Sequence, residues 1–436
     1  MRSVSARHAR GLLALSPVLV FLAVYLVSSL LSGDFYKIPV SAAFLLASAY
    51  AVAITPEKGI NRRLAIFSGG AGHPNVLLMI WIFILAGAFA ETAKEIGAID
   101  ATVHFALHVI PGKMLFAGFF LTACFVSFAM GTSVGTIVAL VPITTGIAGE
   151  TGMDPAQLTA VIVGGAFFGD NLSFISDTTI AATRAAGCEM RDKFKANLLI
   201  VLPAFVVVLL IYLLQGQTVS TIPQASVSQW YKLLPYLLVI CTALCGLNVT
   251  LVLGLGILAN ALLGFVTGTM GWSSMLVSIG SGISGMADLI IVTLLAGGML
   301  ALIRHNGGLD YLVEILTRRI KGPGMAQLSI AALVSLANLC TANNTIAIIT
   351  SGEIAKRISD RFGISPQRTA SLLDTFSCVV QGMIPYGAQL LMASGLAGIS
   401  ALEIIPRLYY PFALAVSALF FIMINRGPAR RNSPVS

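Results

Sequence analysis

Long apolar runs separated by short polar segments make up most of the chain, and their lengths predict membrane-spanning helices. Ten runs are each about 17 to 21 residues long or carry one polar break, which is the length that a helix needs to cross a bilayer. The predicted spans are residues 11–31, 38–54, 76–95, 156–183, 196–214, 231–245, 248–267, 286–304, 366–395 and 405–425.

Two further apolar stretches, 115–149 and 325–358, are interrupted midway by the polar sequences MGTSVGT and CTANNT. A helix that faces lipid along its length would not contain such an interruption. Broken backbone at membrane depth is tolerated only where it lines a cavity inside the protein. We therefore predict that both stretches form re-entrant hairpins.

The composition excludes a soluble globule. Of the 436 residues, 57% are hydrophobic and only 10% are charged, and the mean hydropathy is +0.91. This leaves too little polar surface to cover a soluble protein of this length. The six cysteines lie mostly within apolar segments, where we expect small packing residues rather than disulfides or metal ligands.

Basic residues predict the orientation and explain the net charge of +8 without a nucleic-acid partner. Lysine and arginine accumulate in short cytoplasmic loops, and most of the 26 fall on one side of the predicted layout: in the N-terminus, in loops 55–75 and 184–195, around 304–321 and 356–368, and after 425. We expect a multi-pass protein of a bacterial-type inner membrane with both termini cytoplasmic. The first apolar run is long for a signal peptide and lacks a clear cleavage site, so it is counted as a span.

An internal repeat organises the chain. FILAGAFAETAKEIGAIDATV (83–103) aligns with TLLAGGMLALIRHNGGLDYLV (293–313), and GMDPAQLTA (152–160) with GISPQRTAS (363–371), at an offset of about 210 residues. Each copy then has three spans, one hairpin, one broken span and one further span. Five crossings per copy would place the second copy upside down relative to the first.

The predicted fold class is therefore an all-α polytopic membrane protein with about ten transmembrane helices plus two re-entrant hairpins, in two inverted-topology repeats with broken helices. Secondary transporters built in this way place their binding site near the bilayer midplane. The predicted boundaries are 1–215 for the first inverted repeat, 216–230 for a linker loop, 231–425 for the second inverted repeat and 426–436 for a basic cytoplasmic tail.

Two carboxylates in the fourth span mark the candidate site. The stretch FFGDNLSFISDTT contains Asp170 and Asp177, and an intramembrane carboxylate costs about 2.5 to 3.5 kcal/mol on insertion scales. On an unbroken helix the two would lie about 10 Å apart along the axis, too far apart to bind one ion. We expect the helix to unwind between them. A second interpretation is that Asp177 only caps the second half-helix.

Neutral oxygens beside one carboxylate are ligands that a hard cation such as Na⁺ prefers. The candidate cation- and proton-binding residues of the first broken span are Asp170, Asn171, Ser173, Asp177 and Thr178, with Asp170 as the Na⁺ ligand. The candidate ligands at the hairpin tips are Thr132, Ser133, Thr136, Asn343, Asn344 and Thr345, and the second broken span offers Gln381, Tyr386 and Gln389. Gln381 stands where the first copy has Asp170, so the duplication has left the charge in one half. Asp288 and Asp374, each alone in an apolar segment, are further candidates for the transport path.

The sequences GDNLSFISDTT (169–179) and MGTSVGT (130–136) together resemble the signature of the NhaC-type sodium/proton antiporter family. The hairpin-plus-broken-helix repeat is similar to the wider ion transporter superfamily. The resemblance extends from about residue 70 to residue 400. It implies cation-coupled transport, with Na⁺ and H⁺ as transported or coupling ions and no cofactor. The family commonly has proline where this chain has Phe174, whereas Pro385 stands at the equivalent place in the second copy.

These observations predict a secondary active transporter rather than an enzyme, namely a sodium/proton antiporter that works by alternating access. Burial favours the protonated form of a carboxylate and a bound cation favours the ionised form, so Asp170 would hold H⁺ and Na⁺ in turn. One alternative is a sodium- or proton-coupled exchanger of small organic acids or amino acids. Others are an intramembrane aspartyl protease, which needs two facing carboxylates, and a channel. The expected partners are the lipid bilayer and the transported ions or small solute, with no nucleic acid and with a homodimer left open.

Overall fold

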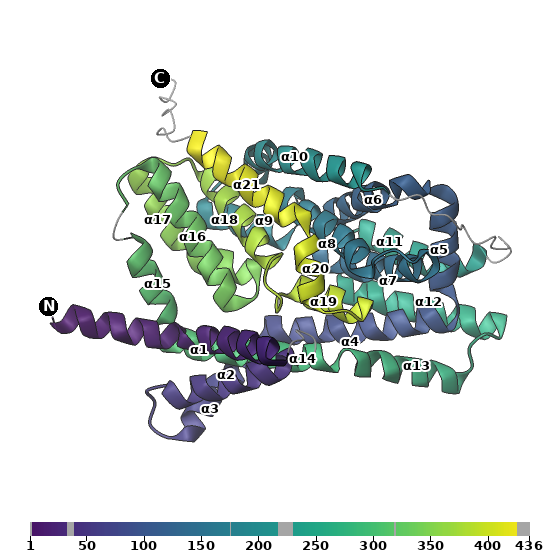
Figure 1. Ribbon diagram of the computed structural model, residues 1–436, viewed down its shortest axis with the longest axis horizontal. Helices are drawn as coiled ribbons and strands as arrows, with labels where there is room; N and C mark the ends of the chain where they lie inside the picture. Colours follow the sequence, from purple (N-terminus) through teal and green to yellow (C-terminus); the bar gives the residue numbers. More distant parts are fainter. Residues whose placement is uncertain (1, 33–38, 175, 217–229, 318–319, 425–436) are drawn as a thin grey trace.

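Helices form all the regular structure in residues 2–32, 39–174, 176–216, 230–317 and 320–424, which are the residues that the computed structural model describes (Figure 1). The first half contains α1 (Arg2–Ser32), α2 (Val40–Ile54), α3 (Ile60–Ala71), α4 (Pro74–Glu95), α5 (Ala98–Val109), α6 (Leu115–Met130), α7 (Ser133–Thr151), α8 (Pro155–Leu172), α9 (Asp177–Ala186) and α10 (Met190–Leu214). The second half contains α11 (Leu234–Leu244), α12 (Val249–Thr267), α13 (Trp272–Gly285), α14 (Ala287–His305), α15 (Gly308–Thr317), α16 (Pro323–Thr341), α17 (Asn344–Phe362), α18 (Pro366–Gln381), α19 (Ala388–Ala397), α20 (Ala401–Ile404) and α21 (Tyr409–Ile424).

Many of these helices can cross a membrane. Among the described residues, eight helical segments are long and apolar enough, or nine if the bent pair Ala388–Ala397 and Ala401–Arg407 forms one span. The total differs from the predicted ten because this criterion also selects hairpin arms such as Ser133–Thr151 and leaves out shorter helices such as Val40–Ile54. The prediction of an all-α polytopic membrane protein is confirmed.

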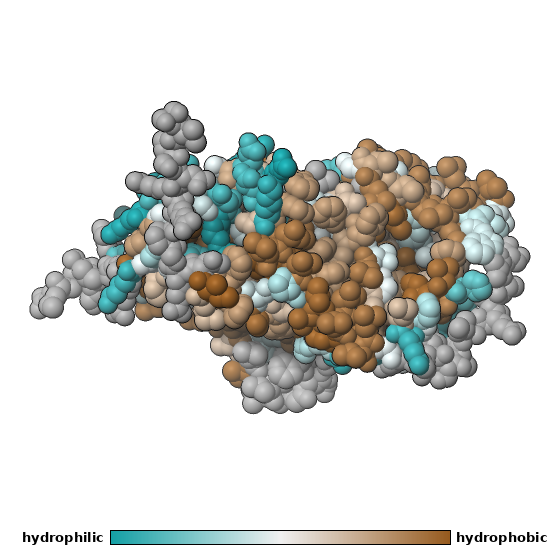
Figure 2. Space-filling view, turned by 90° about the horizontal axis from the view of Figure 1, so that it is seen from above, coloured by the Kyte–Doolittle hydropathy of each residue, from teal (hydrophilic) through white to brown (hydrophobic). Residues whose placement is uncertain are grey.

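The outer surface agrees with a lipid environment. Figure 2 shows hydrophobic side chains over much of the visible face, with hydrophilic side chains gathered mainly toward the left. On α10, large apolar residues including Leu199, Leu202 and Leu210 point outward. Lipid tails are as apolar as leucine, so these side chains need no protein partner.

Two segments that the sequence places in loops are helical instead. The 55–75 loop contains α3, whose Phe67 ring packs against the backbone at Gly298 of α14. The 184–195 loop contains the end of α9 and the start of α10, because α10 begins at Met190. Lys193 therefore lies on a helix and points into the protein, where it is only 1% exposed, and it does not belong with the solvated loop lysines.

The two hairpin tips have the same backbone geometry. Helix α6 ends at Gly131 with φ 67°, and Thr132 follows with φ −146° and caps α7 by accepting a hydrogen bond from Gly135 N. In the second half, Ala342 has φ 49°, and Asn343 follows with φ −146° and caps α17 by accepting from Ile346 N. A left-handed non-glycine residue costs about 1–2 kcal/mol, so the second half keeps this turn although alanine disfavours it.

Tertiary contacts repeat as well. Ser127 Oγ of α6 donates to Ala166 O of α8 at 2.6 Å, and Asn338 Nδ2 of α16 donates to Ser377 O of α18 at 2.7 Å. Both bonds connect a hairpin arm to the broken helix of the same half, at the offset of about 210 residues that the sequence shows. The structure therefore has a repeated architecture. Of the predicted boundaries, nearly all of linker 216–230 and all of tail 426–436 lie outside the described residues.

The helices form two layers in Figure 1. Helices α1 to α4 lie below with α13 and α14, and α6 to α10 lie above with α16 to α21. In the lower layer α4 crosses α13 where Gly87 meets Gly282, and α14 crosses α3 where Gly297 meets Gly70. In the first crossing α4 of the first half packs against α13 of the second, and in the second crossing α14 of the second half packs against α3 of the first. A two-fold relation between the repeats requires this reciprocal pairing.

Candidate functional site

The first broken helix is interrupted between α8 and α9, directly after Asp170 and Asn171. Ser176 caps α9 by accepting from Thr179 N, and its hydroxyl also donates to Asp170 O at 3.0 Å. The Thr178 hydroxyl lies 3.4 Å from the same carbonyl oxygen. The carbonyl end of a helix has partial negative charge, so the end of α8 is a favourable place for a cation.

The Asp170 carboxylate is only 5% exposed and contacts the tip of the first hairpin. Ser133 Oγ, at the start of α7, donates to Asp170 Oδ2 at 2.6 Å. The same hydroxyl accepts from Gln389 Nε2 of α19 at 3.0 Å. Residues of both halves therefore meet at the one carboxylate of this cluster.

A chain of side-chain amides continues from there to the second hairpin. Gln381 Nε2, at the end of α18, donates to Gln389 Oε1 at 2.9 Å and to Ala342 O at 3.0 Å. Since Ala342 is the left-handed residue at the second hairpin tip, hydrogen bonds connect Asp170 to both tips. This arrangement offers hydroxyl and amide oxygens beside one carboxylate, the donor set that a hard monovalent cation takes.

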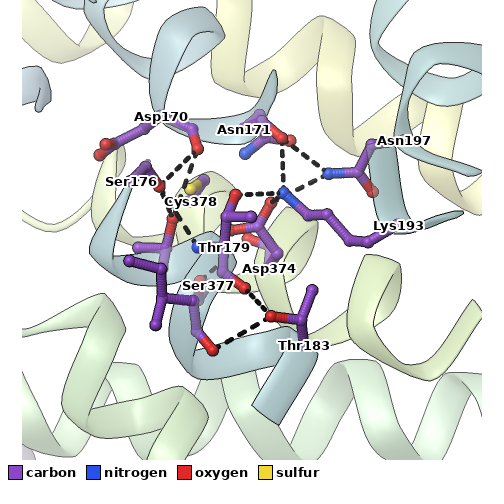
Figure 3. A network of polar contacts seen from close by, with 12 residues as sticks. Asp170, Asn171, Ser176, Thr179, Thr183, Lys193, Asn197, Asp374, Ser377 and Cys378 are labelled. Carbon is purple, nitrogen blue, oxygen red and sulfur yellow. Dashed lines mark hydrogen bonds and ion pairs between the residues drawn. The ribbon is translucent and has the colours of Figure 1, made fainter. Parts of the chain in front are cut away.

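A second polar cluster lies on the other side of the α8 end (Figure 3). Lys193 Nζ contacts Asp374 Oδ2 at 2.6 Å, Asn171 O at 2.7 Å and Thr179 Oγ1 at 2.6 Å. Asn197 Nδ2 donates to Asn171 O and to Asp374 Oδ2, both at 2.9 Å. In Figure 3 the Asp170 carboxylate points away from this cluster.

The structure thus brings together part of the predicted site. Asp170, Ser133, Gln381 and Gln389 form one hydrogen-bonded chain, whereas the backbone oxygen of Asn171 belongs to the Lys193 cluster. Asp177 does not join them, because it is the exposed first residue of α9 beside the capping Ser176. The helix is interrupted between the two acids as expected, and Asp177 is exposed at the first position of α9 rather than buried beside Asp170.

The other predicted residues have partners within their own half of the chain. Ser173 and Thr178 are buried at the α8–α9 break, and Thr136 hydrogen-bonds Thr132 O one turn back. Asn344 Nδ2 lies 4.0 Å from Cys378 Sγ, and its Oδ1 accepts from Thr345 N. Tyr386 OH donates to Leu339 O at 2.8 Å.

A pocket lies between the two layers at the second hairpin tip. Its lining includes Asn343, Thr341 and Tyr386 from the upper layer and Asn75 and Thr293 from α4 and α14. The first turns of α17 and α19 also border it, through Ile346 and Ala388. The rest of the lining is mostly apolar, with Val76, Met79 and Leu391 among its residues, so the pocket combines a few neutral polar side chains with an apolar wall.

The sequence reasoning missed Lys193 and Asn197. It assigned Lys193 to a basic cytoplasmic loop, where lysine is the expected residue. The sequence does contain a signal for this pair, because residues four apart share a helix face and Lys193 and Asn197 directly precede a strongly apolar run.

An apolar all-helical protein in which two repeats bring broken helices together around buried polar groups is built as a secondary transporter. The comparison with known families agrees. The model of the Na⁺/H⁺ antiporter family matches residues 11–217 and again residues 218–425, and the chain belongs to this family.

Individual relatives are distant but cover most of the chain. The Na(+)/H(+) antiporter NhaC of Alkalihalophilus pseudofirmus is 23% identical over 388 residues, which are 81% of this chain and 83% of that protein. The malate-2H(+)/Na(+)-lactate antiporter of Bacillus subtilis is 21% identical over 440 residues, 93% of each. Among solved structures, the YdaH transporter of Alcanivorax borkumensis matches with a TM-score of 0.39 and 14% identity, over 94% of this chain and 98% of that one.

Proposed function

We propose that the protein exchanges Na⁺ for H⁺ across the membrane and that Asp170 holds the two ions in turn. The observation that supports this most directly is the position of the carboxylate: it lies at the end of a half-helix, is nearly inaccessible, and is hydrogen-bonded to a hairpin tip. Membership of the Na⁺/H⁺ antiporter family supports the same pair of ions.

In this mechanism Asp170 supplies the negative charge and Ser133 supplies a neutral hydroxyl oxygen, and Gln389 of the second repeat positions that hydroxyl by donating a hydrogen bond to it. A proton and Na⁺ cannot occupy the same carboxylate oxygens together, so binding of one displaces the other. Alternating access then follows if the upper layer moves against the α4–α13 and α3–α14 crossings, since the site residues named here all belong to the upper layer.

The test is Na⁺-driven proton movement in proteoliposomes that contain purified protein. Asp170→Asn keeps the shape of the side chain and removes the charge, and we expect exchange to be lost. Asp177→Asn is the matched control in the same broken helix, because the Asp177 side chain is exposed, and exchange should stay close to wild type. Rapid exchange by a folded Asp170→Asn variant would contradict the proposal.

A second candidate function, exchange of a small organic acid, is favoured by the pocket at the second hairpin tip. Helix N-termini attract carboxylates. The N-terminus of α19 borders this pocket and has no side-chain cap, whereas Asn343 and Asn344 accept from the first-turn N–H groups of α17. One relative is named as a malate and lactate antiporter. The same vesicles, tested with Na⁺ alone and with a panel of mono- and dicarboxylates, separate the two functions: an absolute requirement for a carboxylate would favour this candidate.

A further inference from the structure

The second polar cluster of the core takes no part in the proposed exchange at Asp170. Among the described residues, the buried charged side chains are Asp170, Asp374 and Lys193. Two acids and one base cannot all be neutralised by one another. Lys193 is paired with Asp374, and Asp170 has a hydroxyl partner instead.

Oxygen atoms surround the Lys193 ammonium in the way that they surround a bound cation. An ammonium group has three donors and no acceptor. All three find an oxygen at 2.6 to 2.7 Å: the main-chain oxygen of Asn171, the hydroxyl of Thr179 and the carboxylate of Asp374. A main-chain carbonyl, a hydroxyl and a carboxylate are also the ligand types that hard metal cations take in proteins.

The cluster has more acceptors than the lysine uses. Asn171 Oδ1, Asn197 Oδ1 and Asp374 Oδ1 are buried without a hydrogen-bond partner. Buried polar atoms are ordinarily paired, so these three oxygens are available as ligands for a cation that takes the place of the ammonium; Asn171 Nδ2 is unpaired as well. These oxygens come from α8, α10 and α18 and thus from both halves of the chain.

We propose that Lys193 is a tethered cation that fills a second monovalent-cation site formed by Asn171, Thr179 and Asp374, and that it thereby limits exchange to the single charge at Asp170. A free ion in this site could cross the membrane with the ion at Asp170. An ammonium on the α10 backbone cannot leave, so the cluster stays neutral while Asp170 changes its ion. The claim that Lys193 limits the exchange rests on the proposed function, whereas the claim that Lys193 fills a cation site can be tested separately.

The experiment counts radioactive sodium bound per chain at saturation in detergent at pH 9, where protons compete least. Lys193→Met removes the ammonium and keeps much of the side-chain length, and we expect it to bind one Na⁺ more per chain than the wild type. Lys195→Met is the matched control, because Lys195 is exposed two residues further along the same helix. It should leave the count unchanged, and so should Lys193→Arg.

A double variant that makes the cluster neutral again distinguishes Na⁺ binding at this site from a general loosening of the fold. Lys193→Met combined with Asp374→Asn has no uncompensated charge in the cluster, so the extra Na⁺ should disappear. A folded Lys193→Met protein that binds no more Na⁺ than wild type would overturn the proposal. If Lys193→Met folds only when Na⁺ is present, this supports the site. If it folds under neither condition while the double variant folds, the site cannot accept a free ion and the proposal fails.

The difference in bound Na⁺ between Lys193→Met and the wild type does not depend on whether Asp170 binds Na⁺. If wild type binds no Na⁺ and Lys193→Met binds one, the exchange proposed at Asp170 is wrong and the second site stands. If wild type binds one Na⁺ and Lys193→Met also binds one, the second site is wrong and Na⁺ binding at Asp170 stands. The ratio of Na⁺ to H⁺ moved, measured from reversal potentials in proteoliposomes, should rise only in the variant with the additional ion.

Discussion

Replacing Ser133 by alanine tests the proposed exchange site through one hydroxyl that connects both repeats. Its Oγ donates to Asp170 Oδ2 at 2.6 Å and accepts from Gln389 Nε2 at 3.0 Å, and the side chain is buried. Alanine removes a donor to the carboxylate and a neutral oxygen from the cation. It also leaves the Gln389 amide with one acceptor fewer. A hydrogen bond to a charged group contributes about 1.5–3 kcal/mol, which is a factor of about 10 to 140 at about 1.4 kcal/mol per tenfold.

We therefore expect Ser133→Ala to raise the Na⁺ concentration for half-maximal exchange by about 10- to 140-fold. Ser133→Thr keeps the hydroxyl and should stay within a few-fold of wild type. The assay is Na⁺-dependent proton movement in proteoliposomes at fixed pH, with thermal melting of each variant as the control for folding. Half-saturation within about twofold of wild type, in a variant that melts normally, would show that the Ser133–Asp170 contact is only packing and would refute the reasoning.

Three further predictions concern other parts of the fold. Asn344→Leu should weaken apparent cation or solute affinity far more than it lowers the melting temperature, and equal losses would make Asn344 a packing residue. Gly87→Ala should destabilise the protein by about 1–3 kcal/mol, as overpacking does, because a Cβ there would overlap the Gly282 carbonyl; Gly254→Ala on α12, where a Cβ would have open space, should melt at or above the wild-type temperature. If the repeats are inverted, cysteines at the exposed positions Glu150 and Asp360, near the ends of α7 and α17, should react with an impermeant reagent from opposite sides of the membrane once Cys188, Cys241 and Cys245 are serine. Labelling from one side would show that the repeats are parallel.

Interruptions in apolar sequence located the helix breaks well. The hairpins predicted at 115–149 and 325–358 correspond to α6–α7 and α16–α17 within a few residues. The break of the fourth span was expected after Asp170 and Asn171, and α8 ends at Leu172. These positions are readable because a polar run inside an apolar segment has few structural solutions in a membrane. Where the helix resumes is less readable, since Ser176 and Asp177 are both good N-terminal residues and only the fold decides between them.

The Lys193–Asp374 pair could not be predicted in the same way. Its partners are far apart in the sequence, and each has an ordinary local explanation. A lysine at the end of a span fits the orientation rule, and nothing in the local sequence distinguishes Asp374 from Asp288, the other isolated acid. The structure separates those two acids: Asp288 is exposed at the start of α14, whereas Asp374 is fully buried. Packing of α10 against α18 brings Lys193 to Asp374, and no local pattern encodes that contact.

The two repeats share a scaffold but differ in chemistry, and this difference bears on how transport works. Both hairpin tips keep the left-handed turn and the side-chain cap, so the backbone geometry of the two tips is equivalent. The acid at the end of α8 is replaced by Gln381 at the end of α18, and Gln381 bonds to Gln389 and to the second tip. A neutral amide needs no counterion, so in the exchange that we propose the first repeat supplies the charge that holds the ion, and Gln381 and Gln389 of the second repeat contribute only hydrogen bonds. Under this proposal the amides of the second repeat form a neutral side of the Asp170 site, and the ion is bound and released at the carboxylate of the first repeat.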